Sequence, residues 1–401
     1  MRFTDANWKA MQDCVARHIA DGNITGAVTG VLQDGNLRID AQGVSDADPQ
    51  FALHTDTIFP VFSMTKPVTA ACALQLVAEG RIGLSDPVSR YIPEFAQPRM
   101  VRTLRSGAPS LAHHDTHGDG EARPQPVYDY APLSRALTVH DFLSFTSGLQ
   151  TIMVPNPDLP PVLPTDSIGS WVARLGTVPL EFEPGTQWHY SNTTCYEVIA
   201  RIIEIVSGTD FASFARERLF EPLGMEDTGF GLPADKAGRV TPLPPMFAGA
   251  PILRNDYASG SAGIFSSLAD YAAFAGLLLN SGQAAGRRVL DPSVVERMQR
   301  PQIGDLPFPG VRAVQYAAPA PHAASGFTYG YGVAVLQDPA RSDTTLPAGS
   351  YGWDGIGTRR LWIVPEKGLA LVLFATGVGP VADPLQRDLE AIIATGGEEE
   401  K

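Results

Sequence analysis

The sequence predicts an α/β protein of the α+β type, in which one antiparallel sheet is built from both ends of the chain. Strand-like apolar runs gather near the N-terminus, at 26–43, and near the C-terminus, at 329–336, 355–364 and 369–375. Helical patterns fill most of the chain between these two groups. If the two groups of strands share one sheet, the chain between them must pack against it as a mainly helical part.

The individual elements follow from local patterns. Residues 26–43 form two short strands around Asp34-Gly35, and Asp-Gly between apolar runs predicts a tight hairpin. An amphipathic helix is expected near the N-terminus, with Trp8, Met11, Val15 and Ile19 on one side. A final helix is expected at 382–394. The helical patterns between the strands lie at 67–79, 138–144, 167–174, 193–206, 210–219, 267–281 and 292–299.

These elements divide the chain into two units. We expect residues 1–62 and 260–401 to form the sheet domain and residues 63–259 to form the mainly helical domain. Residues 97–137 have no periodicity and are rich in Pro, Gly, Ser and His, which predicts a long irregular loop. His113, His114, His117 and Asp119 in this loop could be considered as metal ligands. A solvated loop is the better interpretation, since the helical i, i+4 spacing of ligands is absent.

Composition excludes several classes of function. The 401 residues carry a formal net charge of −13, so little is available to neutralise the phosphates of a nucleic acid. No apolar run approaches the ~20 residues of a membrane span, and the first residues lack a signal-peptide pattern. We therefore expect a cytoplasmic protein with no cofactor, and the oligomeric state stays open. Cys14, Cys72 and Cys195 are odd in number and scattered, which predicts buried free thiols.

The most informative stretch is Ser63-Met64-Thr65-Lys66, where the apolar run Ile58–Phe62 gives way to a helical pattern. Positions i and i+3 share a helix face, so the Lys66 amine can reach the Ser63 hydroxyl. A serine needs a positioned base to act as a nucleophile, and lysine can serve if its pKa is lowered by burial or by a neighbouring cation. The chain has 30 basic residues but only five lysines, which suggests that position 66 needs a group able to lose its proton.

The helix that follows supports this interpretation. Pro67 falls in its first turn, where a missing N–H is harmless, and Gly80 suits its C-terminus. Ser63 then lies at a helix N-terminus, whose free N–H groups favour developing negative charge. On these residues the chain resembles the serine β-lactamase and penicillin-binding-protein superfamily, in its class C-like branch that includes the family VIII carboxylesterases. The resemblance implies an antiparallel sheet flanked by the terminal helices, an all-helical lobe, and a site in the cleft between them.

A second motif, Tyr190-Ser191-Asn192, precedes an apolar helical run. Taken alone, Asn192 could simply cap that helix. By the resemblance, the triplet matches the superfamily's Y-x-N element and brings Tyr190 close to Ser63 and Lys66. Lys66 would then lower the pKa of the phenol, and Tyr190 and Lys66 would act on the serine proton as a coupled pair. Asn192 would bind the acyl-side carbonyl of the substrate or orient Lys66.

The third motif departs from the β-lactamase pattern. Where β-lactamases carry Lys-Thr-Gly, this chain reads Trp353-Asp354-Gly355, close to the Trp-Gly-Gly of family VIII esterases. The resemblance implies that Trp353 offers an apolar wall and that Asp354 repels a substrate carboxylate. Gly355 would let the backbone approach the substrate, and the N–H groups of Ser63 and Ile356 would form the oxyanion hole. The alternative is a buried aromatic residue followed by an Asp-Gly turn.

Two further elements resemble the family without adding catalytic residues. Phe145-Thr146-Ser147-Gly148-Leu149 resembles its H-T-S-G-L turn, and the replacement of histidine by Phe145 suggests packing. The glycine-rich stretch 260–267 resembles the turn before a late helix. Ser259 and Ser261 do not complete a G-x-S-x-G elbow, and the βαβ units of an α/β-hydrolase are missing.

The sequence therefore predicts a serine hydrolase that forms an acyl-enzyme on Ser63. The first interpretation is a carboxylesterase for short- to medium-chain acyl esters, with Lys66 and Tyr190 as the proton-transfer groups. Hydrolysis of amides, including β-lactams, D-amino-acid peptides or oligoamides, and acyl transfer to an alcohol stay open. A non-catalytic module that keeps the penicillin-binding fold is a rival of another class. Such a module would be expected to lose one of these three residues.

Overall fold

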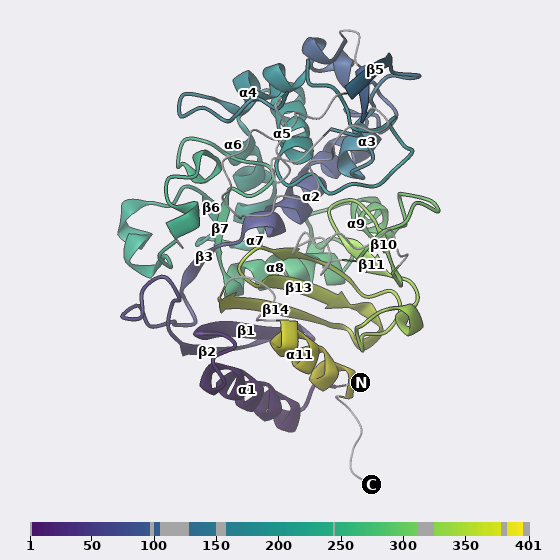
Figure 1. Cartoon of the computed structure of the whole chain (residues 1–401). Helices are drawn as coiled ribbons and strands as arrows, with labels where there is room; N and C mark the ends of the chain where they lie inside the picture. The colour runs from purple at the N-terminus through teal and green to yellow at the C-terminus, as the bar shows by residue number, and fades with distance from the viewer. Residues whose placement is uncertain are drawn as a thin grey trace, which may run out of the picture.

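The computed structural model of the chain describes residues 2–96, 100–104, 128–149, 158–243, 245–310, 325–377 and 383–395. A large antiparallel sheet with its flanking helices lies at one end, and the mainly helical part lies at the other (Figure 1). This is the predicted fold class. The boundaries at 62/63 and 259/260 that the sequence suggests for the two domains stay a prediction.

Both ends of the chain build the large sheet, as predicted. Strand β1 pairs with β14 along its whole length, from Gly26 opposite Thr376 to Gln33 opposite Leu369. The strand order is β10-β11-β12-β13-β14-β1-β2, with every neighbouring pair antiparallel. The strands are β1 Gly26–Gln33, β2 Asn36–Gly43, β10 Phe327–Tyr329, β11 Ala334–Leu336, β12 Tyr351–Gly355, β13 Arg359–Val364 and β14 Leu369–Thr376.

Helices cover both faces of this sheet (Figure 1). Helix α8 (Leu268–Leu279) packs on β1, β13 and β14, while α1 (Asp5–Ala20) and α11 (Asp383–Thr395) lie side by side on the opposite face. Strands enclosed on both faces need apolar residues at successive positions, which explains why β13 and β14 are buried at every residue. The predicted hairpin between β1 and β2 turns at Asp34 and Gly35, with φ of 51° and 75°, as a two-residue turn requires.

The helices of the other part begin and end close to the predicted bounds, except at 210–219. There a short α6 passes into a π-helical stretch, Arg216–Phe220, and then α7. A smaller three-stranded sheet has the order β3-β7-β6, and β3 precedes the start of α2. The bounds are α2 Thr65–Ala78, α3 Val139–Leu143, α4 Ile168–Leu175, α5 Thr194–Ser207, α6 Phe211–Ala215, α7 Glu221–Leu223, α9 Pro292–Gln299, β3 Ile58–Pro60, β6 Gly229–Phe230, β7 Ile264–Ser267, β8 Gln283–Ala284 and β9 Arg287–Arg288.

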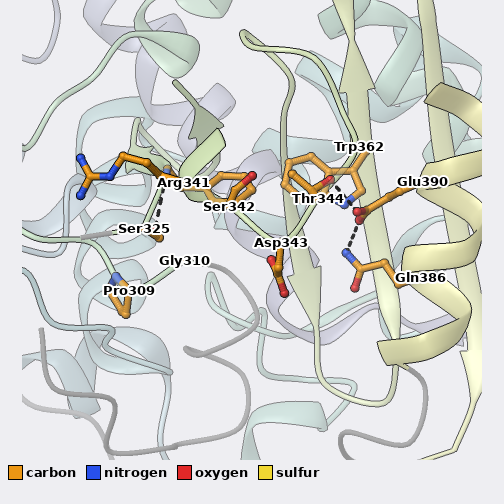
Figure 2. A pocket seen from close by; sticks show the side chains of 11 residues that line it. Pro309, Gly310, Ser325, Arg341, Ser342, Asp343, Thr344, Trp362, Gln386 and Glu390 are labelled. Carbon is orange, nitrogen blue, oxygen red and sulfur yellow. Dashed lines mark hydrogen bonds between the residues drawn. The ribbon is translucent and has the colours of Figure 1, made fainter. Parts of the chain in front are cut away.

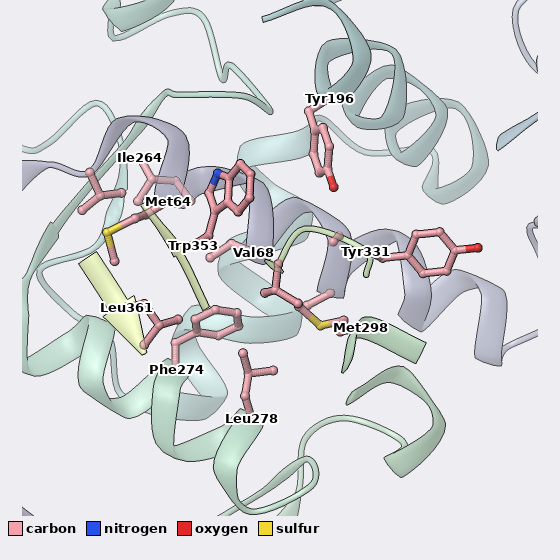
Figure 3. Packing of buried hydrophobic residues seen from close by; sticks show 14 of the residues in the cluster. Met64, Val68, Tyr196, Ile264, Phe274, Leu278, Met298, Tyr331, Trp353 and Leu361 are labelled. Atoms are coloured by element: carbon pink, nitrogen blue, oxygen red, sulfur yellow. The ribbon is translucent and has the colours of Figure 1, made fainter. Parts of the chain in front are cut away.

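One hydrophobic core joins the sheet to the helical part. Figure 3 shows Phe274 of α8 and Leu361 of β13 below Val68 of α2 and Trp353 of β12, with Tyr196 of α5 above them. All five side chains are buried. Helix α2 is buried along most of its length because it packs between α5 and α9. The start of α2, where Ser63 and Lys66 lie, is therefore fixed by both parts of the fold.

One expectation about the strands was wrong, and two others are refined by the structure. The segment 97–137 is not wholly irregular, because β4 (Met100–Leu104) pairs with β5 (Tyr128–Pro132) to form a hairpin. The run at 329–336 is two strands, β10 and β11, because the chain reverses at Gly330–Val333. The run at 355–364 is the end of β12 followed by a turn and β13. Sequence periodicity did not reveal the hairpin because its two strands are separated by a long segment.

Two other expectations concern thiols and membranes. Cys14, Cys72 and Cys195 are free and buried, as predicted. Burial raises the pKa of each thiol, and the charge of Asp388 adds to this effect at Cys14, so these groups are protonated at neutral pH. In the part of the chain that the structure describes, the helices are too short or too polar to cross a bilayer.

The buried strand β14 provides a test of the fold. Leu373→Ala, at a side chain that is 1% exposed, should lower the free energy of unfolding by about 2–5 kcal/mol, since the cavity cannot collapse between two layers. Leu163→Ala, at a side chain that is 44% exposed, is the matched control and should change it by about 0.5 kcal/mol or less. Urea unfolding followed by circular dichroism measures both values. Equal effects at the two positions would contradict the described packing.

Candidate active site

A sharp bend in the chain presents Ser63. Strand β3 ends at Pro60, and Phe62–Met64 form a 3₁₀ turn that leads into α2. Phe62 has φ of 47°, which costs free energy for a residue with a Cβ, and its ring packs on Phe247 at 4.8 Å between centroids. The bend leaves Ser63 half-buried at the helix start, while the residues around it are buried.

The Lys66 amine is fully buried and is held by three acceptors. Its Nζ donates to the backbone carbonyl of Asn192 at 2.7 Å, to the carbonyl of Ser261 at 3.1 Å and to Ser63 Oγ at 3.1 Å. The structure thus brings together the serine and the lysine that the sequence spacing predicted. Two carbonyls satisfy two N–H groups in either charge state, so a neutral Lys66 directs its lone pair at Ser63 Oγ.

Burial lowers the pKa of the Lys66 amine to about 7, while the nearby charge of Glu197 acts in the opposite direction. The ordinary value for lysine is about 10.4. A substantial fraction of the protein therefore carries a neutral Lys66 at pH 7. This is the property that a general base requires.

Tyr190 completes the contact around Ser63. Its hydroxyl donates to Ser63 Oγ at 2.8 Å, and Lys66 Nζ lies 5.0 Å from the centroid of its ring. The expectation that Lys66 lowers the pKa of the phenol is wrong. Burial raises the pKa of Tyr190 well above its ordinary value, and the hydrogen bond to Ser63 only partly offsets this. Tyr190 is therefore a neutral proton donor at pH 7 rather than a phenolate base.

Aromatic rings fix the position of Tyr190. The ring of Phe145 lies edge-on to it at 5.1 Å, and the ring of Trp353 lies 5.5 Å away on β12. Phe145 is buried and also contacts Trp188 and Tyr329, which confirms a packing role for this turn. Trp353 is 0% exposed, so it is a support for Tyr190 rather than the open apolar wall expected for a substrate. Neighbouring side chains, rather than solvent or substrate, cover the apolar surface of Trp353.

Asp354 is not available to repel a substrate carboxylate. Its side chain is 1% exposed and forms a buried ion pair with Arg360, which lies directly opposite on β13. Successive residues of a strand point to opposite faces, so Trp353 and Asp354 cannot both face the site. The sequence expectation was wrong because it assigned both residues to one surface.

Gly355 marks a close approach between β12 and the chain that leads into Ser63. A Cβ at Gly355 would lie 2.4 Å from the carbonyl oxygen of Val61, which only glycine avoids. The 3₁₀ turn at Phe62–Met64 contacts β12 here. Ile356, the expected oxyanion donor, begins the turn between β12 and β13. Its assignment and that of the Ser63 N–H stay predictions.

The structure also identifies residues that the sequence analysis missed. Asn192 contributes its backbone carbonyl to Lys66, whereas the sequence analysis considered its side chain. Ser261 contributes a second carbonyl, and Glu197 is a fully buried acid close enough to influence Lys66. Helix α5 carries other charged residues, Glu204 among them, so no signal in the sequence separates Glu197 from this more exposed acid.

The possible metal ligands of the chain fall into two groups. His113, His114, His117 and Asp119 lie outside the described residues. Among the described residues, Cys14, His18 and Asp388 bring possible ligand atoms together between α1 and α11. The guanidinium of Arg17 donates to Asp388 at 2.6 Å in the same cluster, and a bound cation would be opposed by that charge.

A separate cavity of about 260 Å³ lies beside β10, β13 and α11 (Figure 2). Its wall includes Trp362 and the buried carboxylate of Glu390, which accepts hydrogen bonds from Thr344 and Gln386 at 2.6 Å each. None of the site residues predicted from the sequence lines it. The cavity is therefore distinct from the reactive groups around Ser63.

A nucleophile at a helix start, contacted by a buried amine and a phenol, is the arrangement of a serine hydrolase that works without a histidine. The sequence model of the Beta-lactamase family matches residues 11–395. The chain belongs to this family of β-lactamase-like serine hydrolases, as the resemblance implied.

Relatives of known sequence or structure agree with this membership. The chain is 30% identical over 358 residues to Protein Rv1367c of Mycobacterium tuberculosis, covering 84% of this chain and 82% of the relative. It is 28% identical over 384 residues to Esterase EstB of Burkholderia gladioli, covering 88% and 86%. A crystal structure of a family VIII carboxylesterase matches the fold with a TM-score of 0.71 at 19% identity, covering 98% of each chain.

The close approach at Gly355 generates a prediction. Gly355→Ala should lower kcat/KM for an activated ester by ~10²-fold. The added Cβ forces β12, or the segment at Val61 that leads into Ser63, to shift by a large part of an ångström. Gly238→Ala is the matched control, since a Cβ there meets nothing within 4 Å, and it should keep wild-type activity. Steady-state kinetics on both folded variants give the comparison. Wild-type kcat/KM in Gly355→Ala would contradict the proposed role of this contact.

Proposed function

We propose that the protein is a serine carboxylesterase that forms an acyl-enzyme on Ser63 and acts on short- to medium-chain acyl esters. One observation carries the proposal: Ser63 Oγ lies within hydrogen-bond distance of both Lys66 Nζ, at 3.1 Å, and the Tyr190 hydroxyl, at 2.8 Å. A serine contacted by a base with a pKa of about 7 and by a neutral phenol has the groups that acyl transfer needs.

In the acylation step, the neutral Lys66 amine accepts the Ser63 hydroxyl proton as Oγ attacks the ester carbonyl carbon. The backbone N–H groups of Ser63 and Ile356 then stabilise the tetrahedral oxyanion at the start of α2. As the intermediate collapses, the bond to the alcohol oxygen breaks. Tyr190 transfers its proton to the leaving alkoxide and recovers one from the Lys66 ammonium.

Deacylation reverses these roles with water in the place of the alcohol. Water attacks the acyl carbon, and the proton that it loses passes to Lys66 directly or through Tyr190. When the second tetrahedral intermediate collapses, Ser63 Oγ leaves and is protonated by the same pair. The enzyme returns to its starting state, with one water consumed and one carboxylic acid and one alcohol released.

The choice of an ester substrate has two supports. The motif position at which β-lactamases hold a carboxylate-binding lysine is Trp353, whose apolar ring supports Tyr190 instead. The relatives include a protein named as an esterase and a structure named as a family VIII carboxylesterase. Hydrolysis of β-lactams or other amides and acyl transfer to an alcohol use the same groups and are the alternatives that the kinetics below separate.

The nucleophile can be tested directly. Exposure to a fluorophosphonate should add one phosphonyl group, located by mass spectrometry on the peptide that contains Ser63. Ser63→Ala should remove the adduct and lower ester hydrolysis by at least ~10⁴-fold, because no second nucleophile replaces it. Ser213→Ala, at a half-buried serine of α6, is the matched control and should label like wild type. An adduct on Ser191 or Ser261 would refute the assignment, and retained hydrolysis in Ser63→Ala would refute the proposed function.

Selectivity tests the ester class. We expect kcat/KM for p-nitrophenyl butyrate to exceed that for the β-lactam nitrocefin by at least ~100-fold, equivalent to about 2.7 kcal/mol. Mono-p-nitrophenyl succinate, an ester that adds a carboxylate, is the matched substrate and should also be disfavoured, because the lysine that binds such a group in β-lactamases is replaced by Trp353. Comparable efficiency on butyrate ester and nitrocefin would favour a β-lactamase instead.

A further inference from the structure

A buried carboxylate lies behind the Lys66 amine, at a position the proposed mechanism does not use. Glu197 of α5 is 0% exposed, and its charge is felt by Lys66. A carboxylate is almost never buried unless it is paired or fully hydrogen-bonded. The hydrogen bonds that the Glu197 carboxylate accepts therefore show what stabilises a buried acid at this position.

Within the described part of the chain, the carboxylate of Glu197 accepts its hydrogen bonds from one short segment, residues 257–261. Its Oε2 accepts from the Tyr257 hydroxyl and the Gly260 N–H, both at 3.3 Å. Its Oε1 accepts from the Ser259 hydroxyl and from the Ser261 N–H, the latter at 3.2 Å. A carboxylate can accept about four hydrogen bonds, so this turn and the side chain fit each other closely.

The same turn also contributes to the hydrogen bonds that hold the Lys66 amine. The carbonyl of Ser261 accepts from Lys66 Nζ, and the Ser261 hydroxyl donates to the carbonyl of Thr193 at 2.7 Å. Thr193 follows Asn192, whose carbonyl is the second acceptor of Lys66. One turn beyond Lys66 on α2, the Thr69 hydroxyl donates to the Gly260 carbonyl at 2.7 Å. Glu197 therefore holds the turn through the N–H groups of Gly260 and Ser261. Helix α2 holds the same turn through the Gly260 carbonyl.

We propose that Glu197 is a positioning residue for Lys66: its carboxylate fixes the turn that carries the Ser261 carbonyl and places a negative charge near the amine. The inference rests on the proposed function, because it assigns to Lys66 the role of base. Glu197 itself touches neither Ser63 nor the reacting atoms in this arrangement. It acts through the lysine.

The charge relationship has a definite sign. Burial lowers the pKa of Lys66 to about 7, and the negative charge of Glu197 opposes that decrease. Burial also raises the pKa of Glu197 to about 7, and the hydrogen bond from Ser259 works against it. The two groups therefore titrate as a coupled pair around neutral pH. Removal of the carboxylate charge takes away the larger of the two contributions that oppose burial, so the pKa of Lys66 falls further.

Among the described residues, the titratable groups that contact this pair or lie next to it are uncharged near pH 7, and the charged groups beyond them are paired. Tyr257 lies against Glu197, Cys195 lies on the same helix, and Tyr190 lies against Lys66; burial raises the pKa of all three. Beyond Tyr257, Asp166 and Arg174 form an ion pair at 2.6 Å, which offsets their charges. Arg254 stacks on the outer side of the Tyr257 ring and pairs with Asp256 at 2.8 Å.

The test is the pH profile of kcat/KM for p-nitrophenyl butyrate. In wild type, the rising limb should lie near pH 7 and report the loss of a proton from the coupled Lys66–Glu197 pair. In Glu197→Gln, the rising limb should move to lower pH by about one unit, because an opposite charge nearby is lost. The plateau should fall on the order of 10-fold as the turn loosens. Glu197→Asp keeps the charge, so it should keep the wild-type rising limb with a lower plateau.

Glu204→Gln is the matched control, since Glu204 lies on the same helix and forms an ion pair with Arg201 at 2.9 Å. It should keep both the rising limb and the plateau of wild type. A purely structural Glu197 would lower the plateau and the melting temperature in Glu197→Gln without moving the rising limb, and that result would overturn the proposal. Retained hydrolysis in Ser63→Ala would instead overturn the proposed function, so the two failures are distinguishable.

A second variant covers the case in which Glu197→Gln does not fold. Ser259→Ala removes the hydroxyl that donates to Glu197 and that lowers the pKa of this acid. Glu197 should then be protonated to a greater extent near neutral pH, and its charge should be weaker. The rising limb should move to lower pH by about half a unit, in the same direction as in Glu197→Gln. An unchanged rising limb in a folded Ser259→Ala variant would equally overturn the proposal.

Discussion

The burial of one amine is the constraint on which the rest of the site depends. A lysine ammonium loses several kcal/mol of hydration when it enters a protein interior, and it responds by giving up its proton more readily. The carbonyls of Asn192 and Ser261 offset part of this loss and fix the direction of the Nζ lone pair. A substantial fraction of Lys66 is therefore neutral at pH 7 and can accept a proton, and its Nζ lone pair points at Ser63 Oγ.

The fold supplies that environment from both ends of the chain. β1 and β14 close the sheet, and β12 supports Tyr190 through Trp353 and approaches the entry to Ser63 at Gly355. Helix α5 of the helical part contributes Glu197. This helix begins at Thr194, shortly after Asn192, whose carbonyl accepts a hydrogen bond from Lys66. A site with contributions from the sheet, from α2 and from α5 keeps its geometry only while the two parts stay packed, which the continuous core between α8 and α5 provides.

Local spacing explains what the sequence could predict. Ser63 and Lys66 are one helical turn apart, so their proximity follows from helix geometry alone, and the hairpin at Asp34-Gly35 follows from its turn chemistry. Properties that depend on tertiary packing could not be predicted from the sequence. The burial of Trp353 and the pairing of Asp354 with Arg360 depend on strand register, and the raised pKa of Tyr190 depends on how completely its surroundings exclude water. Sequence alone could not assign Glu197 for the same reason, because its partners lie about 60 residues away.

Direct titration of Lys66 tests the central claim most sharply. The chain has only five lysines, so the side-chain Cε and Nζ signals of a protein labelled in lysine can be followed one by one through a pH series by nuclear magnetic resonance. The account predicts that one lysine titrates near pH 7 and that its signal disappears in Lys66→Arg. A protein in which no lysine titrates near pH 7 would contradict the account, because a permanently charged Lys66 cannot take the proton of Ser63.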